Sequence, residues 1–346
     1  MVHRTDRILD NIPVGALGMI SLPGCEEMGN RVNDYLVKWR KETNHEHKDN
    51  IVFSGYENDT YLINAKVPRF GSGEAKGIIE ESVRGKDLYL MVDVCNYSLT
   101  YSLSGNTNHM SPDDHFQNLK RIIAAVGGKA RRLNVIMPFL YESRQHKRSA
   151  RESLDCALAL QELVRMGVDN IITFDAHDPR VQNAIPLSGF ETVRPTYQFI
   201  KGLLRSFDDL QLDSEHLMAI SPDEGATGRA IYFANVLGID MGMFYKRRDY
   251  TQVVNGRNPI VAHEFLGSSV EGKDVIILDD MISSGDSILD VAKQLKARKA
   301  KRIFAAATFG LFTNGMEKFD EAYEEGLIHG ILTTNLIYQT PELLSR

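Results

Sequence analysis

The stretch from Val275 to Asp290, VIILDDMISSGDSILD, places two carboxylates at the mouth of a loop that otherwise suits an anion. Asp279 and Asp280 end an apolar run, and a turn rich in serine and glycine leads from them into a helical pattern. Backbone N–H groups of this turn and of the helix N-terminus can hold a phosphate. The two aspartates can accept hydrogen bonds from ribose hydroxyls or face a magnesium ion. A sugar phosphate satisfies both requirements, whereas the alternative is an Asp/Ser helix cap after a buried strand. The loop candidates are Ser283, Ser284, Gly285, Asp286 and Ser287.

A basic cluster follows a second apolar run. It consists of Arg144, His146, Lys147, Arg148 and Arg151. Arginine and lysine side chains gathered in this way can bind a polyphosphate. Cations at the start of a helix oppose its dipole, and this local cost indicates an anionic partner. The alternative is a solvated helix start.

Two further clusters follow apolar runs. Asp175, His177 and Asp178 stand together after the run that begins at Asn170, which favours a metal site, with a structural histidine in a turn as the alternative. Three cations, at positions 246 to 248, follow the run that begins at Met241, where the alternative is a surface charge run.

Buried strands alternate with amphipathic helices along the chain, which predicts mostly parallel sheets covered on both faces. Strands are expected from Leu88, Asn134, Asn170, Leu217, Met241, Val275 and Arg302. Helices are expected at residues 152–166, 194–206, 227–237 and 287–299. The length suggests two domains, and prolines and a glycine punctuate the pattern near residues 188–197. We expect domains at residues 1–190 and 191–346, with the last residues as candidates to pack back on the first domain. The polar segments 41–50 and 96–114 indicate loops, the second of them mobile.

The composition excludes several classes of protein. The 346 residues carry a formal net charge of -6, which gives no support to non-specific nucleic-acid binding. The longest apolar runs have the length of a strand and are too short to span a bilayer, and the first ten residues lack the apolar core of a signal peptide. Three cysteines, Cys25, Cys95 and Cys156, have no metal-ligand spacing. A reduced cytoplasmic protein is therefore expected.

The loop after Asp279 resembles the ribose-phosphate loop Asp-Asp-x-x-x-Thr-Gly-x-Thr, with serine here for both threonines. Type I phosphoribosyltransferases and ribose-phosphate pyrophosphokinases share that loop. Four further stretches resemble the pyrophosphokinase family, and phosphoribosyltransferases lack the first three of them. They are FGSGEAKGIIEESVRGKD from Phe70, MPFLYESRQHKRSARE from Met137, TFDAHDPRVQNAI from Thr173, and ISPDEGATGRA from Ile220 with FYKRRDY from Phe244. The likeness spans about Met19 to Leu336 and keeps the family's motif order.

This resemblance implies two phosphoribosyltransferase-like domains, each a mostly parallel sheet flanked by helices. It also implies a magnesium-dependent reaction in which the anomeric hydroxyl of ribose 5-phosphate attacks the β-phosphorus of ATP. The products would be AMP and phosphoribosyl pyrophosphate. Members of the family form dimers that assemble into hexamers, so a homo-oligomer is expected.

The same resemblance implies roles for individual residues. Those that would bind ATP are Phe70, Glu74, Arg144, Gln145 and His177, the first two across a subunit interface. Asp279, Asp280 and the loop at 283–287 would bind ribose 5-phosphate, and Asp223, Gly225 and Arg229 would form the pyrophosphate loop. His177 and Asp223 would hold magnesium, and Lys246 and Arg248, on a mobile loop, would be the catalytic cations.

The sequence departs from the family pattern at four of these motifs. Ser72, His146 and Ser283 each stand where the family has aspartate, and Asp178 replaces a small residue. Extra residues occur at the N-terminus, at 40–66 and at 98–109. Two rival classes therefore stay open: a type I phosphoribosyltransferase, and a non-catalytic regulatory subunit that resembles the synthetase.

Overall fold

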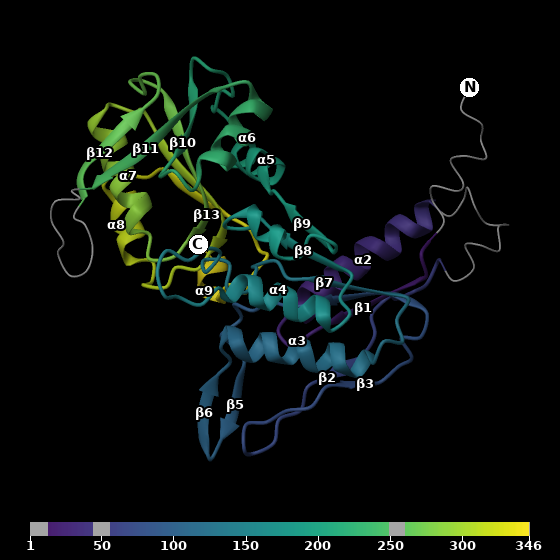
Figure 1. Cartoon of the computed structure of the whole chain (residues 1–346). Helices are drawn as coiled ribbons and strands as arrows, with labels where there is room; N and C mark the ends of the chain where they lie inside the picture. The colour runs from purple at the N-terminus through teal and green to yellow at the C-terminus, as the bar shows by residue number, and fades with distance from the viewer. Residues whose placement is uncertain (1–12, 44–55, 249–259, 346) are drawn as a thin grey trace. The chain divides into compact units, whose positions relative to one another are not determined.

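The computed structural model describes residues 13–43, 56–248 and 260–345. The chain divides into two compact units, residues 1–193 together with 336–346, and residues 194–335 (Figure 1). The expected boundary at 190 and 191 lies three residues before this division. Each unit is built around its own mostly parallel sheet.

The first unit contains a five-stranded sheet in which every neighbouring pair is parallel. In sheet order the strands are β1 (Ala16–Ser21), β4 (Lys86–Met91), β7 (Arg132–Ile136), β8 (Asn170–Phe174) and β9 (Gly189–Val193). Helix α2 (Glu26–Thr43) packs on one face, and α3 (Pro112–Val126) and α4 (Asp155–Arg165) pack on the other. This arrangement follows from strand geometry, because successive side chains point to opposite faces.

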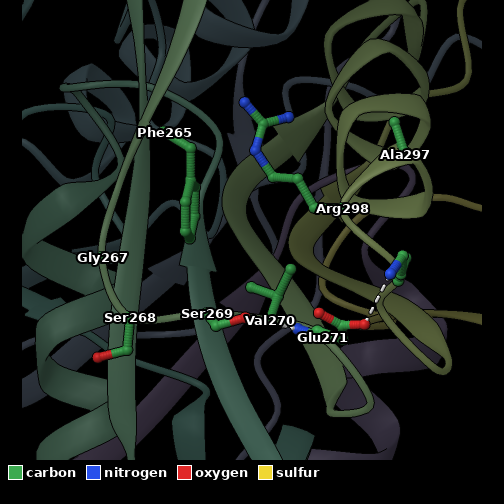
Figure 2. A pocket seen from close by; sticks show the side chains of 9 residues that line it. Phe265, Gly267, Ser268, Ser269, Val270, Glu271, Ala297 and Arg298 are labelled. Carbon is green, nitrogen blue, oxygen red and sulfur yellow. Dashed lines mark hydrogen bonds and ion pairs between the residues drawn. The ribbon is translucent and has the colours of Figure 1, made fainter.

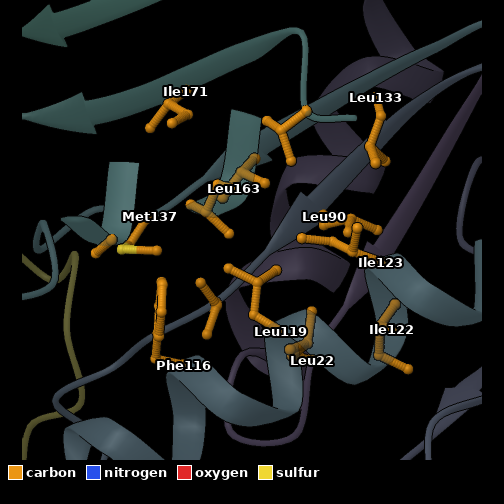
Figure 3. Packing of buried hydrophobic residues seen from close by; sticks show 14 of the residues in the cluster. Leu22, Leu90, Phe116, Leu119, Ile122, Ile123, Leu133, Met137, Leu163 and Ile171 are labelled. Atoms are coloured by element: carbon orange, nitrogen blue, oxygen red, sulfur yellow. The ribbon is translucent and has the colours of Figure 1, made fainter. Parts of the chain in front are cut away.

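The larger core of the first unit lies between the sheet and helices α3 and α4 (Figure 3). Leu90 and Ile171 from the strands meet Leu119 and Ile122 of α3 and Leu163 of α4, and all five are essentially inaccessible to solvent. Both faces of a parallel sheet need such cover, which is why its strands read as continuous apolar runs.

Shorter elements complete the first unit. They are the pair β2 (Ala65–Lys66) and β3 (Ile78–Ile79), the hairpin β5 (Thr100–Leu103) and β6 (Asn106–His109), the 3-10 helix η3 (Pro179–Ala184), and α9 (Pro341–Leu344). The prediction of a mobile loop at 96–114 is wrong, because this segment forms the β5–β6 hairpin and the start of α3. Ser104 and Gly105, between the strands, both have positive φ, as the tight two-residue hairpin turn requires.

The second unit contains a six-stranded sheet that is parallel except for its edge strand β12. In sheet order the strands are β12 (Ile260–Leu266), β11 (Asp240–Arg248), β10 (Leu217–Ser221), β13 (Asp274–Ile282), β14 (Ile303–Gly310) and β15 (Gly330–Thr333). Helices α5 (Thr196–Ser206) and α6 (Thr227–Leu237) cover one face. Helices α7 (Asp286–Ala297) and α8 (Glu317–Glu324) cover the other.

The predicted fold class, mostly parallel sheets flanked by helices, is confirmed. All seven expected strands are present, and the third expected helix has the predicted bounds in α6. The first expected helix begins three residues late, at Asp155, so the basic residues before it lie in turns, bends and irregular backbone rather than in a helix start. Within the described ranges, no helix combines the length and apolar character that a membrane span requires.

Candidate functional site

The candidate residues of the second unit lie at a switch in strand order. From β10 the chain passes through α6 to β11 on one side, and from β13 it passes through α7 to β14 on the other. Loops after β10 and β13 therefore diverge at the carboxyl edge of the sheet, between two strands that pair directly. Ligands of open parallel sheets bind at such points. Both the Asp223 loop and the Asp279 loop are placed there by the strand order.

Asp279 and Asp280 belong to the last residues of β13 and face Arg229 of α6. The Arg229 guanidinium lies 3.7 Å from the Asp279 carboxylate and 3.8 Å from the Asp280 carboxylate. Burial raises the pKa of Asp279 well above its ordinary value, and the neighbouring charge of Asp280 raises it further, while Arg229 acts in the opposite direction. The neighbouring carboxylate thus disfavours the charged form of Asp279.

The loop that follows the carboxylates leads directly into α7. Gly285 has a φ of +83°, and a Cβ at this position would lie 2.1 Å from the Phe319 ring, so only glycine fits. Asp286 begins the helix, where it accepts a hydrogen bond from the Ser284 hydroxyl at 2.9 Å and pairs with Lys318 at 2.7 Å. The loop is thus held in a fixed shape just before a helix N-terminus, which favours anions.

The loop after β10 is organised around Asp223. Its carboxylate accepts a hydrogen bond from the Ala226 N–H at 3.2 Å, and its carbonyl accepts from the Ser221 hydroxyl at 2.6 Å. A Cβ at position 225 would lie only 3.3 Å from the Asp223 carboxylate, and glycine avoids this close contact. Asp223 is half-buried and Gly225 is exposed. This loop leads directly into the N-terminus of α6, so its backbone N–H groups lie at the same carboxyl edge of the sheet.

In the first unit, the loops after β7 and β8 bring His146 and His177 together. Their ring centroids lie 5.1 Å apart. The His146 Nε2 lies 3.5 Å from the carboxylate of Asp178, which Arg180 also binds through its Nε at 2.9 Å. These contacts explain why the pKa of Asp178 falls to about 2, chiefly through the hydrogen bonds from Arg180. His146 and Asp178 are two of the four departures from the family pattern, and the structure places them against each other.

Arg144 and Gln145 occupy the same loop after β7. Arg144 is exposed, and the Gln145 side chain donates a hydrogen bond to the Ser153 carbonyl at 2.6 Å. Because β7 and β8 pair directly, this loop and the His177 loop lie side by side at the carboxyl edge of the first sheet. An exposed arginine next to two imidazoles suits a phosphate group.

Phe70 and Glu74 frame a tight turn between β2 and β3. The Phe70 N–H donates to the Glu74 carbonyl at 2.7 Å, and the Gly73 N–H donates to the Phe70 carbonyl at 2.9 Å. The Phe70 ring is 52% exposed and is therefore available to a ligand. The Ser72 hydroxyl donates to the Glu74 carboxylate at 2.9 Å. Serine in place of the family's aspartate thus orients Glu74, which a second carboxylate would repel.

The prediction that Lys246 and Arg248 lie on a loop is wrong, because both residues belong to strand β11. The backbone of both residues continues β11 and pairs with β12, Lys246 opposite His263 and Arg248 opposite Ile260. A register shift occurs between Arg247 and Arg248. The side chains of these cations and the rest of the predicted loop, residues 249–259, lie outside the described residues.

A pocket of about 300 Å³ lies at the opposite edge of the second sheet, next to the end of α7 (Figure 2). Its wall includes Phe265, and the Arg298 guanidinium lies 5.7 Å from the centroid of that ring. Glu271 and Lys299 pair across its rim at 2.8 Å. None of the candidate residues from the sequence lines this pocket. It lies where parallel strands begin, which is not where ligands of this fold collect.

Comparisons with known proteins match nearly the whole chain. The family model described as the N-terminal domain of ribose phosphate pyrophosphokinase matches residues 17–167, and the phosphoribosyl transferase domain matches residues 194–337. A ribose-phosphate pyrophosphokinase of Vibrio cholerae is 32% identical over 261 residues, which cover 74% of each chain. One from Mycoplasma genitalium is 29% identical over 272 residues, covering 78% of this chain and 74% of the relative.

A solved structure supports the fold. The crystal structure of phosphoribosylpyrophosphate synthetase from Mycobacterium smegmatis superposes with a TM-score of 0.70. It covers 94% of this chain and 91% of its own at 21% sequence identity. At this identity, the likeness shows a shared fold.

Proposed function

Because this chain belongs to the ribose-phosphate pyrophosphokinase family, we propose that it transfers the diphosphoryl group of ATP to the anomeric hydroxyl of ribose 5-phosphate. The products are phosphoribosyl pyrophosphate and AMP. The N-terminal match at residues 17–167 argues against a type I phosphoribosyltransferase, since those enzymes lack the stretches that begin at Phe70 and Met137 within it. Assembly into dimers or hexamers and a cytoplasmic location remain predictions.

The observation that carries this proposal is the carboxylate pair beside a helix N-terminus at the switch in strand order. Asp279 and Asp280 stand at the carboxyl edge of β13, directly before the loop at 283–287. A ligand with hydroxyls at one end and a phosphate at the other matches both parts. Ribose 5-phosphate has this arrangement, whereas a phosphate alone would be repelled by the acidic pair.

The adjacency of the two carboxylates supports recognition of a sugar diol. The adjacent carboxylates of Asp279 and Asp280 can each accept hydrogen bonds. Each ribose hydroxyl is both a donor and an acceptor, so two adjacent hydroxyls can be bound together. Arg229, close to both carboxylates, offsets the remaining negative charge and stands in the first turn of α6, beside the loop proposed to take the pyrophosphate.

The proposed ATP residues are Phe70, Glu74, Arg144, Gln145 and His177. Phe70 and Glu74 offer an exposed ring and a carboxylate acceptor, which suit the face and the amino group of adenine. Arg144 and His177 lie in adjacent loops and suit phosphate oxygens. Lys246 and Arg248 remain the proposed catalytic cations. Phosphoryl-type transfer needs mainly such positioning and charge stabilisation.

Magnesium is the proposed metal, with Asp223 and His177 as its proposed ligands. Within the described part of the chain, no three His, Cys, Asp or Glu side chains are grouped to hold a metal ion. Magnesium is often bound by one or two carboxylates together with substrate phosphates, so Asp223 fits this role, and imidazole is a weaker match. When bound, the metal neutralises charge on the polyphosphate.

The proposal is tested by AMP formation from ATP with and without ribose 5-phosphate and magnesium. We expect AMP and phosphoribosyl pyrophosphate in equal amounts, and only when all three components are present. Release of AMP without the sugar phosphate would indicate hydrolysis instead. A chain that binds both substrates and makes no AMP would be the non-catalytic regulatory subunit.

A further inference from the structure

The β5–β6 hairpin packs against the turn that presents Phe70 and Glu74. Tyr101 and Leu103 are two residues apart on β5 and therefore point to the same face. A Cβ on Gly73 would lie 2.9 Å from the Leu103 side chain, so the leucine sits directly against this glycine, whose φ is +88°. At the tip of the hairpin, the Ser104 N–H donates to the Gly71 carbonyl at 3.2 Å. Both the backbone and the side chains of the hairpin thus touch the turn.

Arg69 connects the hairpin, the turn and helix α3. Its guanidinium lies 4.0 Å from the centroid of the Tyr101 ring. One nitrogen donates to the Gly73 carbonyl at 2.9 Å, and another binds the Asp114 carboxylate at 3.0 Å. The Arg69 side chain is only 12% exposed, and partly buried pairs of this kind hold their geometry better than surface pairs.

Asp114, the partner of Arg69 on α3, is held in place by hydrogen bonds of its own. Asp114 is the third residue of α3 and forms a reciprocal capping box with Ser111. The chain leaves β6 at His109 and enters this cap two residues later. Arg69 therefore ties the turn to a helix terminus that has its own hydrogen bonds, and the hairpin closes the arrangement from the other side.

We propose that the hairpin at 100–109 is a brace that holds the Phe70–Glu74 turn in its nucleotide-binding shape, with Arg69 and Tyr101 as positioning residues. This inference rests on the proposed function, because it assumes that the turn binds the adenine of ATP. The brace belongs to the first unit, whereas the candidate ribose-phosphate loop and β11 belong to the second. It therefore sets the affinity for the nucleotide and leaves the affinity for ribose 5-phosphate unchanged.

The test compares the variants Tyr101→Ser and Tyr101→Phe in the full chain. Serine removes the ring from the Arg69 guanidinium and leaves the Arg69–Asp114 pair in place, whereas phenylalanine keeps the ring. Thr107→Ala is the matched control, since Thr107 is an exposed residue of the same hairpin. For each protein we would measure KM for ATP, KM for ribose 5-phosphate, kcat, and hydrogen exchange of the peptide that contains Gly73.

We expect Tyr101→Ser to lose amide protection in the turn and to raise KM for ATP. If the competent shape falls to about a tenth of the population, apparent affinity falls roughly tenfold. KM for ribose 5-phosphate should stay constant, and Tyr101→Phe and Thr107→Ala should match the wild type. Faster exchange in Tyr101→Ser with unchanged KM for ATP would refute the role in nucleotide binding. Unchanged exchange in this variant would refute the brace itself. A wild-type chain that neither binds ATP nor forms AMP would refute the proposed function itself, and the brace's nucleotide role with it.

Discussion

Replacing Asp93 by asparagine should change how the stability of the first unit depends on pH. Asp93 is 3% exposed, and its carboxylate accepts hydrogen bonds from the Cys95 N–H at 2.8 Å and the Tyr338 N–H at 2.6 Å. Burial raises its pKa from 3.8 to about 6, although these two bonds act in the opposite direction. Burial also raises the pKa of the nearby Cys25 and Cys95 thiols, so both stay neutral across the pH range considered.

The sign follows from which state binds the proton more tightly. A carboxyl with a raised pKa in the folded chain holds its proton where the unfolded chain has lost it, so folding is favoured at low pH. This contribution is fully present below pH 3.8 and is lost as the pH rises through about 6. Asp93 contributes roughly 3 kcal/mol to the free energy of unfolding at low pH, and about 1.4 kcal/mol of this is lost between pH 5 and 7.5.

Asparagine cannot titrate, so Asp93→Asn should remove this dependence of the free energy of unfolding on pH. The variant loses one good acceptor at every pH, a constant cost that does not affect the comparison. The free energies of unfolding of the two proteins are measured with urea at pH 5.0, 6.0 and 7.5. The signal is the fluorescence of Trp39, the only tryptophan, which lies on α2 of the first unit. The advantage of wild type over variant should be about 1.4 kcal/mol larger at pH 5 than at pH 7.5. Parallel pH profiles for the two proteins would refute the reasoning.

Three further predictions concern the proposed reaction. Asp280→Asn should weaken use of ribose 5-phosphate by about 1.5–3 kcal/mol through loss of a charge-assisted hydrogen bond; unchanged KM and kcat for that substrate would contradict it. His177→Ala should raise the magnesium concentration needed for activity more than it lowers the melting temperature, and the reverse pattern would indicate a structural histidine. Lys246→Ala should keep calorimetric affinities for both substrates and lose roughly a hundredfold to a thousandfold in turnover; full turnover would move the catalytic cations elsewhere.

Local patterns in the sequence predicted seven of the eleven strands that the two sheets contain in the described residues. Parallel strands buried on both faces must be apolar throughout, so β13 and β14 stand out. The run after Met241 was harder. Its cations indicated a loop, yet the backbone of Lys246 continues β11 because β12 returns antiparallel beside it. Such pairing depends on a partner that local composition does not reveal.

The candidate site was predictable as separate motifs and not as an arrangement. Asp280 and Arg229 were assigned to different loops, and their proximity depends on β10 and β13 being neighbours. The hairpin was missed, although Ser104 and Gly105 between two short polar strands are a recognised turn signal. Arg69 gave no signal at all, because its partner Asp114 is 45 residues away.

The return of residues 336–346 to the first unit has a consequence for the order of folding. Residues 194–335 form one uninterrupted stretch, so the second unit can fold as soon as that stretch has been synthesised. The first unit begins earlier and finishes later, because Asp93 receives its bond from Tyr338 across 245 residues. Until then, a buried carboxylate lacks one of its two donors. A chain cut short before residue 336 should therefore contain a finished second unit and an unfinished first one.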